Sequence, residues 1–258
     1  MSDAVTLTLR TRLTARLDMR GITPDCCAVR STHEIAALPL WLGTSQTTVG
    51  DLFEVRGERA ARLDIHGDLE LASGVGARMA GGVLHVRGSV GDDAGQAMSG
   101  GVLRIDGHAG RRLGGAAAGA ARGMTGGEII VFGSAGDEAG AVMRRGLVAV
   151  VGGTGAYAGR AMIAGTLLAL GPLGELPGSG SKRGSIIAAG GVSVPASDRF
   201  ACAYEPPFVR LLLTSLRRRF GFPCDPALLA GRFDRYCGDA GEPGKGELLV
   251  WTGAMDRP

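Results

Sequence analysis

A short run of apolar residues ending in glycine recurs seven times between residues 62 and 190, and this repetition limits the fold more than any other feature. Successive copies begin 21, 19, 26, 19, 19 and 19 residues apart. The copies are RLDIHG from Arg62, VLHVRG from Val83, VLRIDG from Val102, EIIVFG from Glu128, LVAVVG from Leu147, TLLALG from Thr166 and SIIAAG from Ser185. A period of about 20 residues is typical of a solenoid, in which each repeat forms one turn of a rod.

Side-chain alternation and glycine spacing indicate what each repeat forms. The second and fourth residues of every copy are apolar, as the inward face of a short strand requires. Glycines recur at fixed offsets where backbone corners are expected, in the second copy at Gly88, Gly91, Gly95 and Gly101. We therefore predict a mainly β fold, a right-handed parallel β-helix of about seven rungs.

A methionine recurs once in each of the first five rungs, and Ser181 takes its place in the sixth. Two interpretations are a row of thioether metal ligands and a row of core side chains. No histidine or cysteine accompanies the row, and unbranched methionine fills irregular interior space well. We therefore predict core packing for Met79, Met98, Met124, Met143 and Met162.

Composition narrows the class of protein. The net charge is only +3 and aromatic residues make up 5% of the chain, so a nucleic-acid surface is not expected. The five cysteines are odd in number and form no C-x-x-C pair, which argues against a disulfide framework or zinc site and favours a reducing cytoplasm. Arginines interrupt the N-terminal segment, and no uncharged apolar run approaches the ~20 residues of a membrane span. We expect a cytoplasmic protein with no membrane contact.

The chain divides into three parts around the repeats. Residues 1–61 are predicted to form an α+β cap, with strands at Val5–Arg10 and Thr47–Val55 and a capping box at Ser31–Glu34 before a short helix. Residues 62–203 form the β-helix. Residues 204–258 form a C-terminal helix, Phe208–Phe220, and a tail that pack on the β-helix or on a partner.

The outward positions of the copies, third and fifth, change character along the rod. They are polar in the first three copies and apolar from the fourth onward. A lone rod would not leave such a strip in water, so we expect the C-terminal helix to cover part of it through Leu212 and Leu216, and a partner the remainder. Arg217–Arg219 form either a solvated helix end, where they suit the helix dipole, or a contact with an acidic partner. The candidate partner interface is Ile130, Phe132, Val151, Leu168, Leu170, Arg217, Arg218 and Arg219.

No catalytic constellation emerges from the residues. The glycine-rich stretches from Gly88, Gly152 and Gly178 recur through the rungs, whereas a nucleotide loop occurs once, between a strand and a helix. Asp92-Asp93 align with Arg111-Arg112 and Asp137-Glu138 in the next rungs, which predicts a ladder of opposite charges rather than paired catalytic carboxylates. The four histidines fall at different offsets. We therefore expect no catalytic, cofactor-binding or metal-binding residues in this chain.

The third copy is longer than the others, and its excess lies in a small-residue loop at 114–123. Insertions in repeat proteins often map to a binding face, so this loop is either a binding element or a tolerated surface loop. A small-molecule enzyme that uses the loop is the third class of function we consider.

The rung pattern, a strand followed by G-x-x-G-x-x-x-G-x-x-M-x-x-G, resembles the glycine-rich β-helix domain of two families. One is the C-terminal domain of the glutamate synthase large subunit, and the other is the C-type subunit of formylmethanofuran dehydrogenase. The second resemblance is closer and covers most of the chain. It includes STHEIAALPL and VGDLFEV between Ser31 and Val55, RGMTGGEIIVFGSAGDEAG from Arg122, YEPPFVRLL from Tyr204 and RYCGDAGEPGKGELL from Arg235.

Within that family, the chain is most similar to the corresponding subunit of the formyltransferase/hydrolase complex of methylotrophic bacteria. The resemblance implies a scaffold in one-carbon metabolism, beside a formyltransferase subunit, an amidohydrolase-like metal subunit and a further subunit. These partners transfer a formyl group from formyl-tetrahydromethanopterin to a methanofuran-type carrier and release formate. The alternative is a stand-alone relative of the glutamate synthase domain in nitrogen metabolism.

Overall fold

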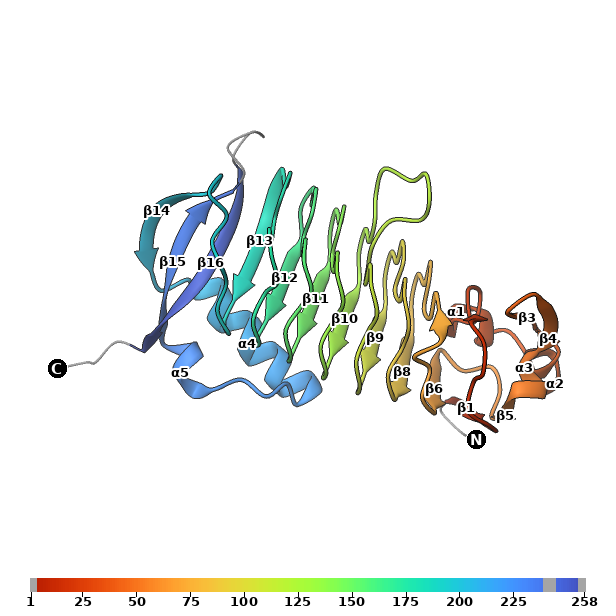
Figure 1. Ribbon diagram of the computed structural model, residues 1–258. Helices are drawn as coiled ribbons and strands as arrows, with labels where there is room; N and C mark the ends of the chain where they lie inside the picture. The colour runs from red at the N-terminus through yellow and green to blue at the C-terminus, as the bar shows by residue number, and fades with distance from the viewer. Residues whose placement is uncertain (1–3, 239–244, 255–258) are drawn as a thin grey trace.

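The computed structural model describes residues 4–238 and 245–254. The fold is mainly β and is dominated by a 12-stranded mixed sheet, with a separate sheet of four short strands. Figure 1 shows the repeat strands side by side along the molecule, with the N-terminal elements at one end and strands β14–β16 at the other. Among the described residues, no helix is long and apolar enough to cross a membrane.

The seven repeats form a stack of parallel strands, each hydrogen-bonded to the strand of the repeat before it. The first residues of the copies lie opposite one another, from Arg62 and Val83 through to Thr166 and Ser185. A second row of parallel bridges links Leu69, Val90, Ala109, Ala135, Thr154 and Leu173. The stack strands are β6 (Arg62–His66), β8 (Val83–Arg87), β9 (Val102–Ile105), β10 (Glu128–Val131), β11 (Leu147–Val150), β12 (Thr166–Ala169) and β13 (Arg183–Ala188).

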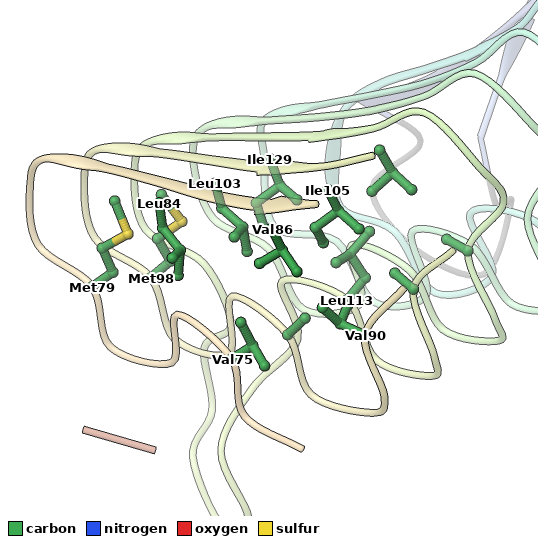
Figure 2. Close-up of a cluster of buried hydrophobic side chains, with 14 of the residues drawn as sticks. Val75, Met79, Leu84, Val86, Val90, Met98, Leu103, Ile105, Leu113 and Ile129 are labelled. Atoms are coloured by element: carbon green, nitrogen blue, oxygen red, sulfur yellow. The ribbon is translucent and has the colours of Figure 1, made fainter. Parts of the chain in front are cut away.

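The core of the stack is built from the predicted positions. The second and fourth residues of all seven copies are buried, and so are the five methionines. Figure 2 shows Met79 and Met98 beside Leu84 and Leu103 of neighbouring repeats. The side-chain alternation and the methionine row are therefore confirmed as core features.

The N-terminal segment covers the start of the stack. β1 pairs in parallel with β6 and antiparallel with β5, and α2 begins with the expected Ser31–Glu34 capping box. The prediction of one continuous strand at Thr47–Val55 is wrong, because a one-turn helix with its own Thr48–Asp51 capping box divides that segment. The elements are β1 (Val5–Leu9), β2 (Leu17–Asp18), α1 (Pro24–Cys27), α2 (Thr32–Ala36), β3 (Pro39–Leu42), β4 (Ser45–Thr48), α3 (Val49–Leu52), β5 (Phe53–Arg56) and β7 (Ala72–Ser73).

The C-terminal segment contains more strand than the sequence indicated. β16 pairs in parallel with β13 and so extends the stack, while β15 and β14 follow it in antiparallel pairing. Helix α4 lies across the outer face of the sheet (Figure 1). The elements are β14 (Arg199–Tyr204), α4 (Pro207–Phe220), α5 (Pro226–Leu229), β15 (Gly231–Cys237) and β16 (Lys245–Ala254).

Candidate functional surfaces

The apolar outer strip is covered by this chain's own helix α4. Third-position residues of repeats four to seven have no exposed surface and share one cluster with Val209, Leu213 and Leu216 of α4. The covered strand residues are Ile130, Ala149, Leu168 and Ile187. Of the two helix residues expected to cover the strip, Leu216 does so fully and Leu212 only partly, because Leu213 takes the inward position.

The structure separates the residues predicted as a partner interface into three groups. Ile130 and Leu168 are core residues beneath α4, whereas Phe132, Val151 and Leu170 are half-buried at the edge of the same cluster. Arg219 is held by an ion pair to Glu128, with a 2.7 Å hydrogen bond from Nη1 to Oε1. Arg217 and Arg218 are exposed. Among the eight predicted interface residues, they are the two charged side chains that have no ion-pair partner within the described residues.

The C-terminal end of α4 is fixed onto strands β9 and β10. Gly221 adopts a left-handed φ of 68° and donates its N–H to the Arg217 carbonyl, which ends the helix. The next residue, Phe222, is buried and meets Phe132 edge-to-face at a ring separation of 6.3 Å. These contacts determine which face of the helix turns inward.

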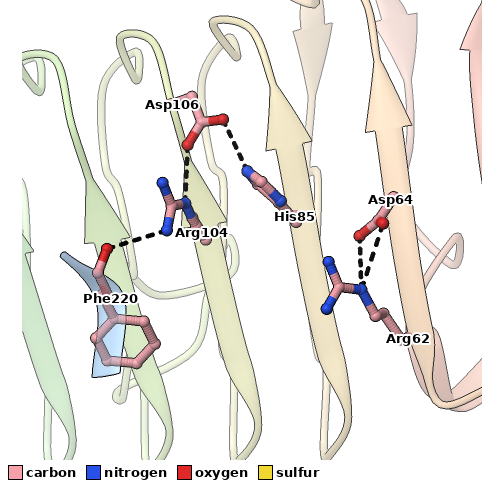
Figure 3. Close-up of polar contacts among 6 residues, drawn as sticks. All are labelled: Arg62, Asp64, His85, Arg104, Asp106 and Phe220. Carbon is pink, nitrogen blue, oxygen red and sulfur yellow. Dashed lines mark hydrogen bonds and ion pairs between the residues drawn. The ribbon is translucent and has the colours of Figure 1, made fainter. Parts of the chain in front are cut away.

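A polar network joins the same helix end to the outer face of the stack (Figure 3). Asp106 accepts a 2.8 Å hydrogen bond from Arg104 Nε and lies 2.7 Å from His85 Nε2. Arg104 Nη1 also donates a 3.1 Å hydrogen bond to the carbonyl oxygen of Phe220, and the guanidinium stacks on the Phe132 ring, 4.3 Å from its centroid. Partial burial raises the pKa of Asp106, but hydrogen bonds from Arg104 and His85 outweigh that effect and the pKa lies below its usual value.

The predicted charge ladder is present at one corner of the repeats. Arg112 makes two 2.7 Å hydrogen bonds to Asp93, and Arg111 lies 3.6 Å from Asp137. Glu138 is paired with Arg160 one repeat further on, at 3.2 Å. These contacts join carboxylates and arginines of neighbouring repeats, as the aligned charges predict.

A groove lined by five cations is the surface that sequence reasoning missed. Arg144, Arg145, Lys182, Arg183 and Lys245 line a volume of 470 Å³ with Ile163 and Ala164. None of the lining residues is acidic, and the structure gives these cations no ion-pair partner within residues 4–238 and 245–254. Such a groove attracts a ligand or protein segment with several negative charges.

Part of this groove had a signal in the sequence. Arg144-Arg145 and Lys182-Arg183 lie 38 residues apart, which is two periods of 19, and so occupy the same corner of the stack. Lys245 lies outside the repeats and reaches the groove because β16 pairs with β13, which places it opposite Arg183. Only the fold reveals this last cation.

A second hollow lies beside the loop at 114–123. Its 720 Å³ volume is lined by Arg20, Arg78, Asp93 and Gln96, with Ala117 and Ala118 contributed by the loop. Arg20 is already bound to Asp18, and Asp93 to Arg112. In the described part of the chain, no three or more His, Cys, Asp or Glu side chains are grouped to hold a metal ion.

The fold and these surfaces define a mainly β repeat protein whose notable features are a helix-covered sheet face and a basic groove. No protein-family model matches the sequence, and no curated protein matches it. A chain in the X-ray crystal structure of the formyltransferase/hydrolase complex (FhcABCD) from Methylorubrum extorquens, in complex with methylofuran, matches with a TM-score of 0.78. The two are 36% identical, over 95% of this chain and 98% of that chain. The chain therefore belongs to the family of that complex component.

Proposed function

We propose that this chain is the scaffold subunit of a formyltransferase/hydrolase complex, equivalent to the C-type subunit of formylmethanofuran dehydrogenase. The observation that carries the proposal is the 36% identity along nearly the full length of both chains. Similarity over a single motif would be compatible with many functions, but this match covers 95% of this chain and 98% of the other.

The chemistry of the proposed complex is carried by partner subunits. A formyltransferase subunit moves a formyl group from formyl-tetrahydromethanopterin to a methanofuran-type carrier, and an amidohydrolase-like metal subunit releases formate. The matched complex contains methylofuran, which supports a carrier of this type. This chain contributes no catalytic, metal-binding or cofactor-binding residue of its own and works in the cytoplasm.

The architecture suits such a role. We assign the stack of residues 62–203 as a right-handed parallel β-helix, which residues 1–61 cover at one end and residues 204–258 at the other. Parallel in-register strands with two rows of bridges support this assignment. A rod of this kind is rigid and presents long faces, so it can hold several partners at fixed separations.

Native mass spectrometry of the tagged chain, purified at natural expression from its source cells, tests the proposal. We expect a heteromeric particle that contains formyltransferase and amidohydrolase-like chains. A stable monomer or homo-oligomer would contradict the proposal, and association with an amidotransferase would favour the glutamate synthase alternative.

A further inference from the structure

Helix α4 has an outer face that does not contribute to the fold. Its inward side chains, Val209, Leu213 and Leu216, are each 1% exposed. On the opposite side Leu211 is 71% exposed and Phe208 is 39% exposed, and they lie three residues apart on one face. Two large apolar side chains are thus held together in water by a helix whose other face is fixed to the sheet.

The charged side chains of α4 are all positive. The helix, PFVRLLLTSLRRRF, carries four arginines and no acidic residue. Arg219 is paired with Glu128, but Arg210, Arg217 and Arg218 are exposed and have no ion-pair partner within the described residues. The helix dipole favours Arg217 and Arg218 in the last turn, whereas Arg210 lies in the first turn, where the dipole disfavours a cation. Helix stability therefore does not explain Arg210.

We propose that the outer face of α4 docks onto another protein chain whose contact surface is apolar at its centre and acidic at its rim. The inference rests on the proposed function, since the partner is a subunit of the formyltransferase/hydrolase complex. Exposed Phe and Arg side chains with no lysine are typical of the residues enriched at protein interfaces. Because the inner face already fixes the helix, docking requires little ordering of the backbone.

Charge also selects the kind of partner. A twofold contact between two copies of this face would bring arginines of one copy close to arginines of the other, because α4 carries no carboxylate that could pair with them. Like charges brought together at a contact disfavour that arrangement. Carboxylates on a different chain would compensate Arg210 and Arg218, while its apolar centre covers Phe208 and Leu211.

The test compares recovery of identified complex subunits with four versions of the tagged full-length chain, expressed in the source cells. Three of them are wild type, Leu211→Asp and Val29→Asp. Val29 is the matched control, because it is 74% exposed and lies in the N-terminal segment, far along the chain from α4. A fourth version, Arg210→Glu with Arg218→Glu, tests the acidic rim. Circular dichroism and thermal melting confirm that each purified variant is folded.

We expect Leu211→Asp to reduce recovery of formyltransferase/hydrolase subunits about tenfold or more, with Val29→Asp unchanged. The double arginine variant reduces recovery and also reverses the salt dependence of binding, since two glutamates would repel an acidic rim and added salt screens that repulsion. Equal recovery with wild type and Leu211→Asp would overturn this inference and leave the proposed function intact.

Two further results would overturn either the proposed function or the choice of partner. Failure of the wild-type chain to recover any formyltransferase/hydrolase subunit would overturn the proposed function and this inference with it. A homo-oligomer of the wild type that Leu211→Asp dissociates would overturn the choice of partner and assign the face to a second copy of this chain.

Discussion

Gly133 follows strand β10, at a point where two repeats come so close that no side chain fits between them. A Cβ at this position would lie 2.5 Å from the carbonyl oxygen of Gly107 in the preceding repeat. The Gly133 N–H donates a 2.9 Å hydrogen bond to that same oxygen, so the neighbouring backbone cannot move away without losing the hydrogen bond. The glycine is therefore required by close approach and not by its backbone angles.

Replacing Gly133 by Ala is expected to lower the free energy of unfolding by about 2 kcal/mol or more, as overpacking of a tight interior does. The matched variant is Gly221→Ala, where φ is +68° and nothing lies within 4 Å of the added carbon. That variant costs only the left-handed backbone penalty, about 1 kcal/mol. Thermal and urea unfolding of both variants measure the difference. If Gly133→Ala were no less stable than Gly221→Ala, the repeats would be shown to relax and the close-approach argument would fail.

At this scale the sequence was most informative. Period-two alternation identified the buried side chains, and the aligned charges of Asp93 and Arg112 identified their contact, because the repeat places equal offsets side by side. The same rule places His85 opposite Arg104 on neighbouring strands. It could not find the hydrogen bond from Arg104 to the Phe220 carbonyl, 116 residues away, because no period relates those two positions.

Helix α4 shows what sequence pattern can and cannot determine for an element. The run from Phe208 to Phe220 predicted a helix that covers the strip through Leu212 and Leu216, and the helix is present at Pro207–Phe220. Leu216 does face inward, but its inward neighbours are Val209 and Leu213, and Leu212 is only partly buried. Apolar residues occupy more than half the circumference of the first two turns, so the pattern admits both faces. The Phe222–Phe132 contact and the Arg104 bond to Phe220 select between them.

The Asp106 network that attaches this helix end gives an expected pH dependence. The pKa of Asp106 is lower in the folded chain than in the unfolded one, so its contribution to stability is present above the unfolded pKa of about 3.9. That contribution disappears as the pH falls through the folded pKa. Asp106→Asn should therefore melt below wild type at pH 7, and the gap should shrink between about pH 5 and pH 3.

Melting temperatures at several pH values check this expectation. Asp64→Asn is a suitable control, because within the described residues the ion pair of Asp64 is with Arg62 of the same strand and not with α4. Its effect at pH 7 should be smaller. A gap between wild type and Asp106→Asn that stays constant down to pH 3 would show that the lost stability does not come from the charge of Asp106.

Considered as a whole, the molecule is a stack whose two ends are built differently. The N-terminal end is covered by local elements, of which the Ser31–Glu34 capping box and the alternation of β1 were predicted from the sequence. The C-terminal end is completed by β16. It pairs with β13, although β14, α4, α5 and β15 lie between the two strands in the sequence. That pairing carries no period or turn signal, so sequence reasoning could not find β16 as a further parallel strand or the antiparallel strands beyond it.

Removing residues 204–258 is expected to make the chain insoluble, although every repeat remains. The truncation uncovers Ile130, Ala149, Leu168 and Ile187, which have no exposed surface in the intact chain, and it leaves the edge of β13 unpaired. An exposed apolar face beside an open strand edge promotes association between copies. Sedimentation and far-UV circular dichroism of the truncated and full-length chains give the comparison.

Deleting residues 116–122 is the matched control for this truncation, because it returns the 26-residue third repeat to the 19-residue spacing of its neighbours and uncovers none of the strip. A soluble, monomeric truncated chain with an intact β signal would mean that the stack folds without the C-terminal segment. Aggregation of the truncated chain alone would instead make the helix and terminal strands part of the same folding unit. In that case the outer face of α4, and not the strip beneath it, is free to meet a partner.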